Sequence, residues 1–391
     1  MGYAWEYLER LSAFPHRGSA TPEEAAAAEA ARDWFQALGY EVEVQPFLTP
    51  KDTLYLGPFV VSLGMLLAAW TGLRLPWGGL VICAMFLAPL VGELLCIPWL
   101  DLDWLVPRHR SQNVIARKPA VSGADSPRRT VVITGHYDTQ RATWLFHPRM
   151  VRWLQVYFFI VYGLFALLPM VLFFRMILPE QPWTGQILIG DSILIALNAV
   201  FLLLCWRSGG YINGANDNGS GAALVLALAR HFAQEELPGT DLIFVLTGAE
   251  EVGTRGMKAF MRQARFDPKT TVFINLDNLG GGTLHYLTGE GMLTVFPYSP
   301  QLTALAEEVA RETGTEIRPK PNLLLPTDGL IPSKAGYHAI SFLAFLKDGS
   351  LPNYHWYTDT LDQVDRDLLE AEERFLVAYV RRTAAGLPEA A

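Results

Sequence analysis

The sequence RTVVITGHYD, residues 129–138, decides the fold class of this chain. Six of its first seven positions carry no charge, and the run ends in a histidine and an aspartate, His136 and Asp138. Uninterrupted apolar strands are typical of parallel sheets that are covered on both faces. Because residues i and i+2 of a strand share a face, the carboxylate of Asp138 is expected beside the imidazole of His136.

Strands and helices alternate along the polar parts of the chain. Strands are expected over residues 41–47, 113–117, 129–134, 241–247, 271–276 and 338–345, and helices over residues 23–38, 221–232, 257–264, 300–313 and 367–385. This alternation predicts a mostly parallel sheet with helices on both faces. The expected fold class is therefore α/β, a three-layer α/β/α domain.

The composition is more apolar than that of an ordinary globular chain. Apolar residues make up 51% and charged residues 18% of the 391 residues, against about 25% charged in an average chain. The excess lies in four stretches, residues 54–73, 75–92, 153–174 and 181–206. Since about 20 apolar residues cross a bilayer core, each is predicted to be a transmembrane helix rather than a buried core helix. Glu93 and Asp191, near the ends of two stretches, would reach the interface or face the bundle.

The four helices are predicted to form two hairpins that interrupt one catalytic domain. Residues 1–50, 108–152 and 207–391 would form the catalytic domain, and residues 51–107 and 153–206 the transmembrane hairpins. Six basic residues flank the spans on the catalytic side and two on the far side: Lys51, Arg108, Arg110, Arg149, Arg152 and Arg207 against Arg74 and Arg175. The positive-inside rule then predicts a multi-pass protein of the cell membrane with a cytoplasmic catalytic domain. Residues 1–50 show no signal-peptide pattern, which agrees.

Composition also excludes some function classes. The chain has 31 basic and 39 acidic residues, a net charge of −8, and no long basic run, so no nucleic-acid partner is expected. Its three cysteines, Cys83, Cys96 and Cys205, lack the CxxC spacing of a thiolate zinc site and cannot form a disulfide framework. The expected partners are a peptide substrate and the lipid bilayer, and the sequence leaves the oligomeric state open.

Acidic and histidine side chains follow several of the expected strands. Asp217 lies in the glycine-rich turn NGANDNGSGA, Glu250 and Glu251 in FVLTGAEEVG, Asp277 in FINLDNLG, and His355 in NYHWYTD. Individually each has a plain structural explanation; Asp217, for example, could cap a helix. Packing gives no reason, however, to place two adjacent carboxylates at the end of a buried strand. Because α/β sheets bind ligands at the carboxyl ends of their strands, the set predicts an active site there.

In this order the motifs resemble the co-catalytic two-zinc aminopeptidase family, which includes bacterial leucyl aminopeptidases, glutamate carboxypeptidases and glutaminyl cyclases. The resemblance implies two Zn²⁺ ions. One would be held by His136 and Asp277 and the other by Glu251 and His355, with Asp217 as the bridging ligand. Imidazole and carboxylate ligands suit zinc.

The resemblance also implies the reaction. The chain would be a membrane-anchored exopeptidase that removes N-terminal residues by a metal-bridged hydroxide, with Glu250 as general base and Asp138 holding His136. The family often has a cis peptide after the bridging aspartate, here Asp217–Asn218. A glutaminyl cyclase-like or other amide-group reaction is an alternative. Another is a catalytically inactive peptidase-like receptor or adaptor, which loss of ligands would mark; here all five ligand positions are filled.

Two departures from the family pattern stand out. Gly329 follows Asp328 where relatives have a histidine, which puts the usual structural part of Asp328 in doubt. The region 322–326, NLLLP, lacks a tyrosine that helps some relatives to stabilise the oxyanion. Tyr354 and Tyr357 are the candidate substitutes, although tyrosines beside a ligand loop more often serve packing.

Overall fold

A computed structural model describes residues 2–97, 99–121, 128–323 and 325–387. The chain divides into two compact units. The sheet unit comprises Met1–Thr49, His109–Ala142 and Tyr211–Ala391, and the helix unit comprises Pro50–Arg108 and Thr143–Gly210. Parts of the domain ranges expected from the sequence, namely residues 1, 98, 122–127, 324 and 388–391, lie outside the described residues.

The sheet unit is built on a nine-stranded sheet. In spatial order its strands are β1 (Glu41–Pro50), β2 (Arg108–Lys118), β6 (Thr240–Thr247), β3 (Arg129–His136), β7 (Thr271–Leu276), β11 (His338–Phe345), β8 (Thr283–Glu290) and β10 (Ile317–Asn322), and β9 (Phe296–Pro297) pairs with β8. The four central strands β6, β3, β7 and β11 are parallel. β2 and β8 run antiparallel to their neighbours β6 and β11. The short strands β4 (Arg141–Ala142) and β5 (Gly210–Tyr211) pair separately.

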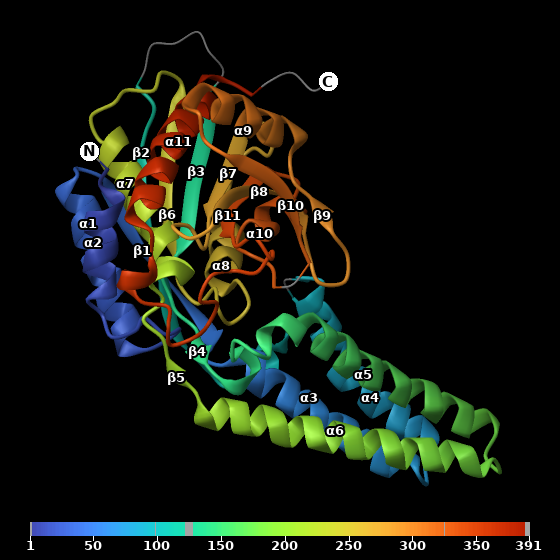
Figure 1. The fold of residues 1–391 in the computed structure, drawn as a ribbon. Helices are drawn as coiled ribbons and strands as arrows, with labels where there is room; N and C mark the ends of the chain where they lie inside the picture. The colour runs from blue at the N-terminus through green and yellow to red at the C-terminus, as the bar shows by residue number, and fades with distance from the viewer. Residues whose placement is uncertain (1, 98, 122–127, 324, 388–391) are drawn as a thin grey trace. The chain divides into compact units, whose positions relative to one another are not determined.

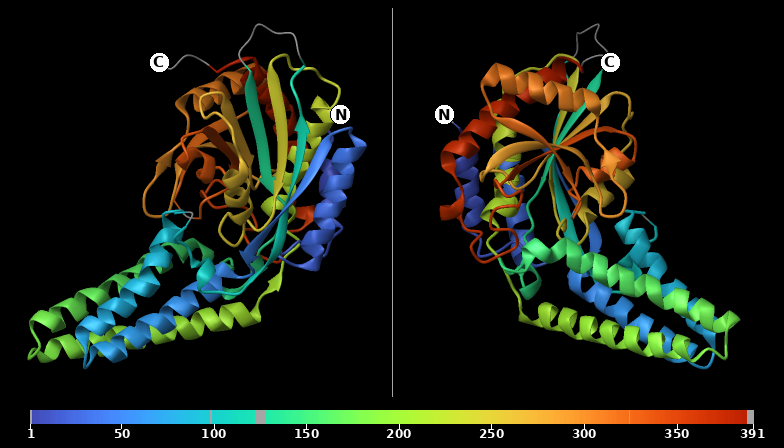
Figure 2. Two further views of the ribbon diagram at one scale, coloured as in Figure 1. Left: turned by 180° about the vertical axis from the view of Figure 1, so that it is seen from behind. Right: turned by 45° about the vertical axis from the view of Figure 1, so that its right-hand side comes forward.

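Helices cover both faces of this sheet, which confirms the predicted three-layer α/β/α class (Figures 1 and 2). One face carries α1 (Ala4–Ser12), α2 (Pro22–Ala37), α7 (Gly221–Phe232), α9 (Pro300–Thr313) and α11 (Arg366–Ala385), and the other carries α8 (Arg255–Gln263) and α10 (Leu330–Lys334). The alternation of β3 residues shows why both faces need cover. Val131 and Ile133 belong to the core on the first face, and Val132 belongs to the core on the second.

Several elements of the sheet unit were not expected from the sequence: the helices α1 and α10, the strands β8 and β10, and the two-residue strands β4, β5 and β9. β10 has the sequence IRPKPN, in which two prolines and two basic residues hide the strand. Proline cannot donate to a neighbouring strand, so it is tolerated mainly on edge strands. Among the described strands β10 lies at the edge of the sheet and pairs with β8, which explains the composition.

The helix unit contains four helices that are long and apolar enough to cross a membrane. In the described part of the chain these four are α3 (Thr53–Gly72), α4 (Pro76–Leu94), α5 (Leu154–Ile177) and α6 (Pro182–Ser208). α3 packs against both α4 and α6, and α5 packs against α4 and α6. Short helical turns complete the chain: η1 (Leu102–Trp104), η2 (Trp144–Phe146), η3 (Val151–Trp153), η4 (Ala215–Ser220) and η5 (Leu361–Gln363).

Polar side chains in the helix unit point into the bundle. Asp191 is 3% exposed and Asn198, two turns further along α6, is 8% exposed. Asn198 accepts a hydrogen bond from the Tyr157 hydroxyl at 2.8 Å and lies 3.4 Å from Ser62 Oγ. Of the two outcomes expected for Asp191, the structure therefore shows the one in which it faces the bundle.

Glu372 of α11 provides a pH-dependent test of the sheet unit. Its carboxylate accepts a hydrogen bond from Gly280 N at 2.8 Å, and burial, together with the neighbouring Asp365, raises its pKa to about 8. Because the folded state binds this proton more tightly than the unfolded state, the contribution of Glu372 to stability is lost as pH rises through about 8. We therefore expect the melting temperature of Glu372→Gln, compared with that of the wild type at the same pH, to rise by about 5 °C as the pH increases from 5 to 8.5.

The measurement is thermal unfolding of the detergent-solubilised full chain across that pH range. Glu370→Gln on the same helix is the matched control and should run parallel to the wild type. A constant difference between Glu372→Gln and the wild type across the whole pH range would contradict the assignment.

Candidate metal centre

The candidate site residues lie where strands of the parallel sheet end. The sheet positions them by its register: His136 of β3 pairs with Thr247 of β6, so the end of β3 and the loop after β6 lie side by side. The site residues come from β3 and the loop after it, the turn η4, the loop after β6, the loop after β7 and the loop after β11: His136 and Asp138, Asp217, Glu250 and Glu251, Asp277, and His355. The structure thus brings together segments separated by more than 200 residues.

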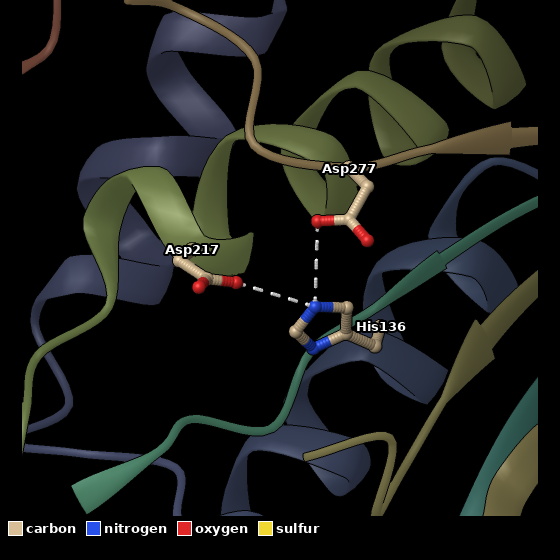
Figure 3. A group of neighbouring side chains, drawn as sticks. All are labelled: His136, Asp217 and Asp277. Atoms are coloured by element: carbon tan, nitrogen blue, oxygen red, sulfur yellow. Dashed lines mark ion pairs between the residues drawn. The ribbon is translucent and has the colours of Figure 1, made fainter. Parts of the chain in front are cut away.

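The first group of possible ligands consists of His136, Asp217 and Asp277, all buried (Figure 3). His136 Nε2 lies 3.4 Å from Asp217 Oδ1 and 3.7 Å from Asp277 Oδ1. In Figure 3 both carboxylates point toward this ring nitrogen. Asp277 also accepts a hydrogen bond from Asn278 Nδ2 at 2.9 Å. Three donor atoms that converge from three segments are the arrangement that a metal ion requires.

The second group consists of Asp217, Glu251 and His355, and it shares Asp217 with the first. His355 Nε2 lies 3.0 Å from Asp217 Oδ2 and 3.1 Å from Glu251 Oε2. The two oxygens of Asp217 therefore face different groups, Oδ1 toward His136 and Oδ2 toward His355. One carboxylate with an oxygen for each of two groups has the geometry of a bridging ligand.

Asp138 and Glu250 lie beside these groups. Asp138 accepts hydrogen bonds from Glu250 N at 2.9 Å, Glu251 N at 3.2 Å and the Ser19 hydroxyl at 2.6 Å. Its carboxylate is 3.5 Å from His136 Nδ1. The shorter contacts show that Asp138 holds the Glu250–Glu251 backbone at least as closely as it holds the imidazole. Glu250 Oε2 lies 3.8 Å from His136 Nε2.

The turn that carries Asp217 has an irregular backbone. The Asp217–Asn218 peptide is cis, as the resemblance implied. Asn218 ties this turn to the end of β7, because its Nδ2 donates to Leu276 O at 2.9 Å and its Oδ1 accepts from Asn278 N at 3.2 Å. Asn218 Oδ1 also accepts from Gly221 N, the first residue of α7.

The donor set fits a divalent cation such as zinc. Within the described part of the chain, Glu251 Oε1 is buried and has no hydrogen-bond partner. Burial raises the pKa of Glu251 to about 7 and that of Glu250 well above its ordinary value, and neighbouring carboxylates add to both shifts. Bound cations would add to the positive charge that this buried acidic cluster takes from its histidines and from the nearby Arg17. Histidine and carboxylate donors without thiolates are typical of catalytic zinc sites.

The departure at Gly329 has a steric reason. An added Cβ would lie 2.2 Å from Ser341 Oγ and 2.4 Å from Tyr298 Oη, so a side chain at this position would force these two hydroxyl groups to move. Asp328, the preceding residue, is buried and accepts a hydrogen bond from Thr247 Oγ1 at the end of β6. Tyr298 and Ser341 therefore occupy the space in which a residue 329 side chain would begin.

Of the two candidate tyrosines, Tyr354 lies directly against a candidate ligand. Its ring stacks on the His355 imidazole with 3.9 Å between ring centroids. Burial and the carboxylates of Asp217 and Glu251 raise the pKa of Tyr354 well above its ordinary value. Tyr357 is 53% exposed and packs against Trp356. Leu324, in the region without the expected tyrosine, lies outside the described residues.

Several residues that hold the site were missed in the sequence. Arg17 is fully buried and Asp359 is fully buried, and both bind the backbone of segments that carry candidate ligands. Gln140 donates to the Glu251 carboxylate at 3.2 Å. Asp359 follows His355 by only four residues, so its place in the same motif was a usable signal. For Arg17, in a polar segment after the first helix, the sequence holds no such signal.

Comparison with known proteins identifies the class. The model of peptidase family M28 matches residues 191–380. The vacuolar membrane protease of Schizosaccharomyces pombe is 41% identical over 69 residues, 18% of this chain and 8% of that protein. The probable lipoprotein aminopeptidase LpqL of Mycobacterium tuberculosis is 28% identical over 184 residues, 40% of this chain and 37% of that protein. The matches thus span less than half of each relative's length.

Solved structures show the same fold at low sequence identity. The aminopeptidase from Aneurinibacillus sp. strain AM-1 has a TM-score of 0.59 at 16% identity, over 97% of this chain and 93% of that one. The zinc aminopeptidase of Bacillus subtilis gives 0.58 at 15% identity over 99% and 98%, and the glutaminyl cyclase of Bacteroides thetaiotaomicron 0.58 at 14% over 97% and 96%. The family predicted from the motifs is confirmed. The chain matches the model of peptidase family M28 over 190 of its 391 residues, shares the fold of solved zinc aminopeptidases and glutaminyl cyclases, and carries four membrane-type helices in the part that the structure describes.

The contacts of Gly329 predict the effect of a side chain there. Gly329→Ala should lower the free energy of unfolding by about 1–3 kcal/mol, because overpacking forces its neighbours apart. The double variant Ser341→Ala/Tyr298→Phe lacks the two oxygens that the new Cβ would meet. Gly329→Ala should therefore cost less stability in this double variant than it costs in the wild type. The check is denaturant unfolding of the four proteins, and equal losses in both backgrounds would show that these oxygens are not the obstacle.

Proposed function

We propose that this membrane protease is a zinc exopeptidase that removes N-terminal residues from peptides, with two Zn²⁺ ions in its active site. The observation that carries the proposal is the division of Asp217 between two ligand groups, with Oδ1 3.4 Å from His136 and Oδ2 3.0 Å from His355. A single-metal site needs only one such group. Two groups that share a carboxylate match the requirement of a co-catalytic pair.

The proposal assigns a role to each residue. His136 and Asp277 would hold one ion, Glu251 and His355 the other, and Asp217 both. Bound zinc would acidify an attacking water and polarise the scissile carbonyl.

Glu250 would take the proton of that water and give it to the leaving amine. Its carboxylate is within 3.8 Å of His136 Nε2, at the border of the first group. Asp138 would keep Glu250 in place through the hydrogen bond from Glu250 N. A carboxylate that serves first as general base and then as general acid must be held in place, because each proton transfer requires hydrogen-bond distance.

A glutaminyl cyclase-like or other amide-group reaction is the second candidate, because a glutaminyl cyclase shares the fold. The presence of both ligand groups favours the two-zinc hydrolase. An inactive receptor or adaptor is the third. Every ligand position predicted for an active enzyme is filled by a side chain that can bind zinc, which speaks against that function.

The first test combines metal content with activity. Purified wild type and Glu250→Gln should each contain two zinc ions per chain by mass spectrometry. Only the wild type should hydrolyse aminoacyl anilides quickly; we expect Glu250→Gln to be slower by about 10²–10⁴-fold, the usual loss when a general base is removed. Glu236→Gln, an exposed glutamate of the sheet unit, is the matched control and should behave as the wild type.

Four outcomes would contradict the proposal. One zinc per chain would refute the paired site, and an active Glu250→Gln would refute the base. Zinc-loaded wild type that cyclises N-terminal glutamine, or that turns over no substrate in the panel, would favour the second or third candidate.

We further propose that the two hairpins interrupt the catalytic domain at the predicted boundaries. We also propose that the hairpins span the cell membrane and that the catalytic domain lies on its cytoplasmic side. The basic residues near the spans support the orientation. All three native cysteines are buried, so an introduced exposed cysteine can be labelled selectively. Glu180, in the exposed turn between α5 and α6, and Glu236, in the sheet unit, are suitable positions.

A membrane-impermeant maleimide should label Glu180→Cys in intact cells and Glu236→Cys only after permeabilisation. Labelling yield is read by mass spectrometry of the purified protein. The opposite pattern would place the catalytic domain outside the cytoplasm and would leave the proposed reaction untouched.

A further inference from the structure

Two buried charges of opposite sign hold the segment that carries Asp217. Arg17 lies before α2, and Asp359 lies after His355 in the loop that follows β11. Both are 0% exposed. Neither side chain belongs to either group of possible metal ligands. A buried charge is costly unless it is hydrogen-bonded and compensated, so each of these residues calls for an explanation.

Arg17 joins two ligand-bearing segments through their carbonyl groups. Its Nε donates to Tyr137 O at 2.7 Å, directly after His136. Its terminal nitrogens donate to Asn213 O at 2.9 Å and Gly214 O at 2.8 Å, just before Asp217. The planar, five-donor guanidinium suits a junction of this kind, in which one side chain binds several carbonyls at fixed angles.

The backbone of Arg17 strengthens the same junction. Arg17 N donates to Thr139 Oγ1 at 3.0 Å, and Thr139 N donates to Arg17 O at 3.2 Å. The segment from His136 to Thr139 is thereby tied to Arg17 by both its backbone and its side chain.

Asp359 holds the same turn from its amide side. Its Oδ1 accepts from Asn216 N at 2.6 Å and its Oδ2 from Asp217 N at 2.9 Å. Both oxygens thus bind backbone amides, those of Asp217 and of the residue before it, while the Asp217 side chain faces the two histidines. Because Asp359 is four residues from His355, it also ties the loop of a second ligand to this turn.

The two charges also act on each other and on the cluster. Burial lowers the pKa of Arg17 to about 10, with opposing contributions from Asp359, Asp138 and Asp217, so the guanidinium is still cationic at neutral pH. A permanent cation next to a cluster of carboxylates offsets part of their mutual repulsion. The four hydrogen bonds that it donates to backbone carbonyls hold this cation in place.

We propose that Arg17 and Asp359 are positioning residues for the metal centre, which hold the segments of His136, Asp217 and His355 at the spacing that binds zinc. The inference rests on the proposed function and deepens it. The inference predicts a change in metal affinity. When either residue is replaced, the ligands are no longer held at a fixed spacing, so zinc should bind more weakly even in a variant that folds. Residues that orient metal ligands typically contribute 10- to 100-fold in affinity.

Lys118 offers a matched control for Arg17. Its ammonium also binds backbone carbonyls, those of Phe232, Ala233 and Glu235, at 2.6–3.0 Å. These carbonyls lie at the C-terminal end of α7, twelve residues from its start beside the metal centre, or about 18 Å along the helix. Lys118→Met therefore removes a cation–carbonyl junction of the same kind at a distance from the ligands.

The experiment measures zinc affinity by competition with a chromophoric chelator, and melting temperature with and without zinc. All variants carry Glu250→Gln, so that the readout does not depend on activity. We expect Arg17→Met and Asp359→Asn to bind zinc at least tenfold more weakly than the parent and to gain less melting temperature from zinc. Lys118→Met should lose stability equally in both conditions and keep its zinc affinity within twofold.

Asp359→Asn keeps the size of the side chain, so it tests the inference if Arg17→Met fails to fold. Unchanged zinc affinity in a folded Arg17→Met or in Asp359→Asn would overturn the inference and leave the proposed function standing. Failure of the parent itself to bind zinc would instead refute the proposed function.

Discussion

Mutual repulsion among buried carboxylates is the constraint on which the sheet unit depends. Asp217, Asp277, Glu250 and Glu251 meet at one edge of the sheet with two histidines among them, and Glu251 keeps a buried oxygen without a hydrogen-bond partner in the part of the chain that the structure describes. Such a cluster is stable only if cations or fixed hydrogen bonds compensate its charge. The surrounding structure supplies the hydrogen bonds. Bound zinc ions, which the donor set suits, would supply the compensating positive charge.

The fold answers this constraint with secondary hydrogen bonds from distant segments. Glu24, at the start of α2, accepts from Ala249 N at 3.1 Å and from the Ser111 hydroxyl at 2.9 Å, and so fixes the chain just before Glu250. Asp138 then holds the next two amides. Two acidic residues that bind backbone amides, Glu24 and Asp138, thus position the segment of the acidic residues that face the site, Glu250 and Glu251. The arrangement explains why the sheet unit buries so many carboxylates in a region where packing alone would favour apolar side chains.

Much of this structure could be predicted from the sequence, because apolar strands and apolar spans leave strong patterns. The central strands β3, β6, β7 and β11 and the four long helices lie where the runs of apolar residues indicated. β10 was missed, since its two prolines hide an edge strand, and the orientation of Asp191 into the bundle depends on packing that no local pattern reveals. In the site, residues that follow strands were visible, whereas Arg17 was not, because its partners are carbonyl groups that carry no sequence signal. The sequence shows that Gly329 departs from the family pattern, and the positions of Tyr298 and Ser341 in the structure explain why a glycine stands there.

The central claim is that Asp217 bridges two zinc ions, and it is tested most directly by anomalous X-ray diffraction at the zinc absorption edge from crystals of the full chain. The account predicts two anomalous peaks per chain separated by about 3.5–4 Å. One should lie beside His136 and Asp277 and the other beside Glu251 and His355, with Asp217 between them. A single peak, or two peaks that do not share Asp217, would contradict it.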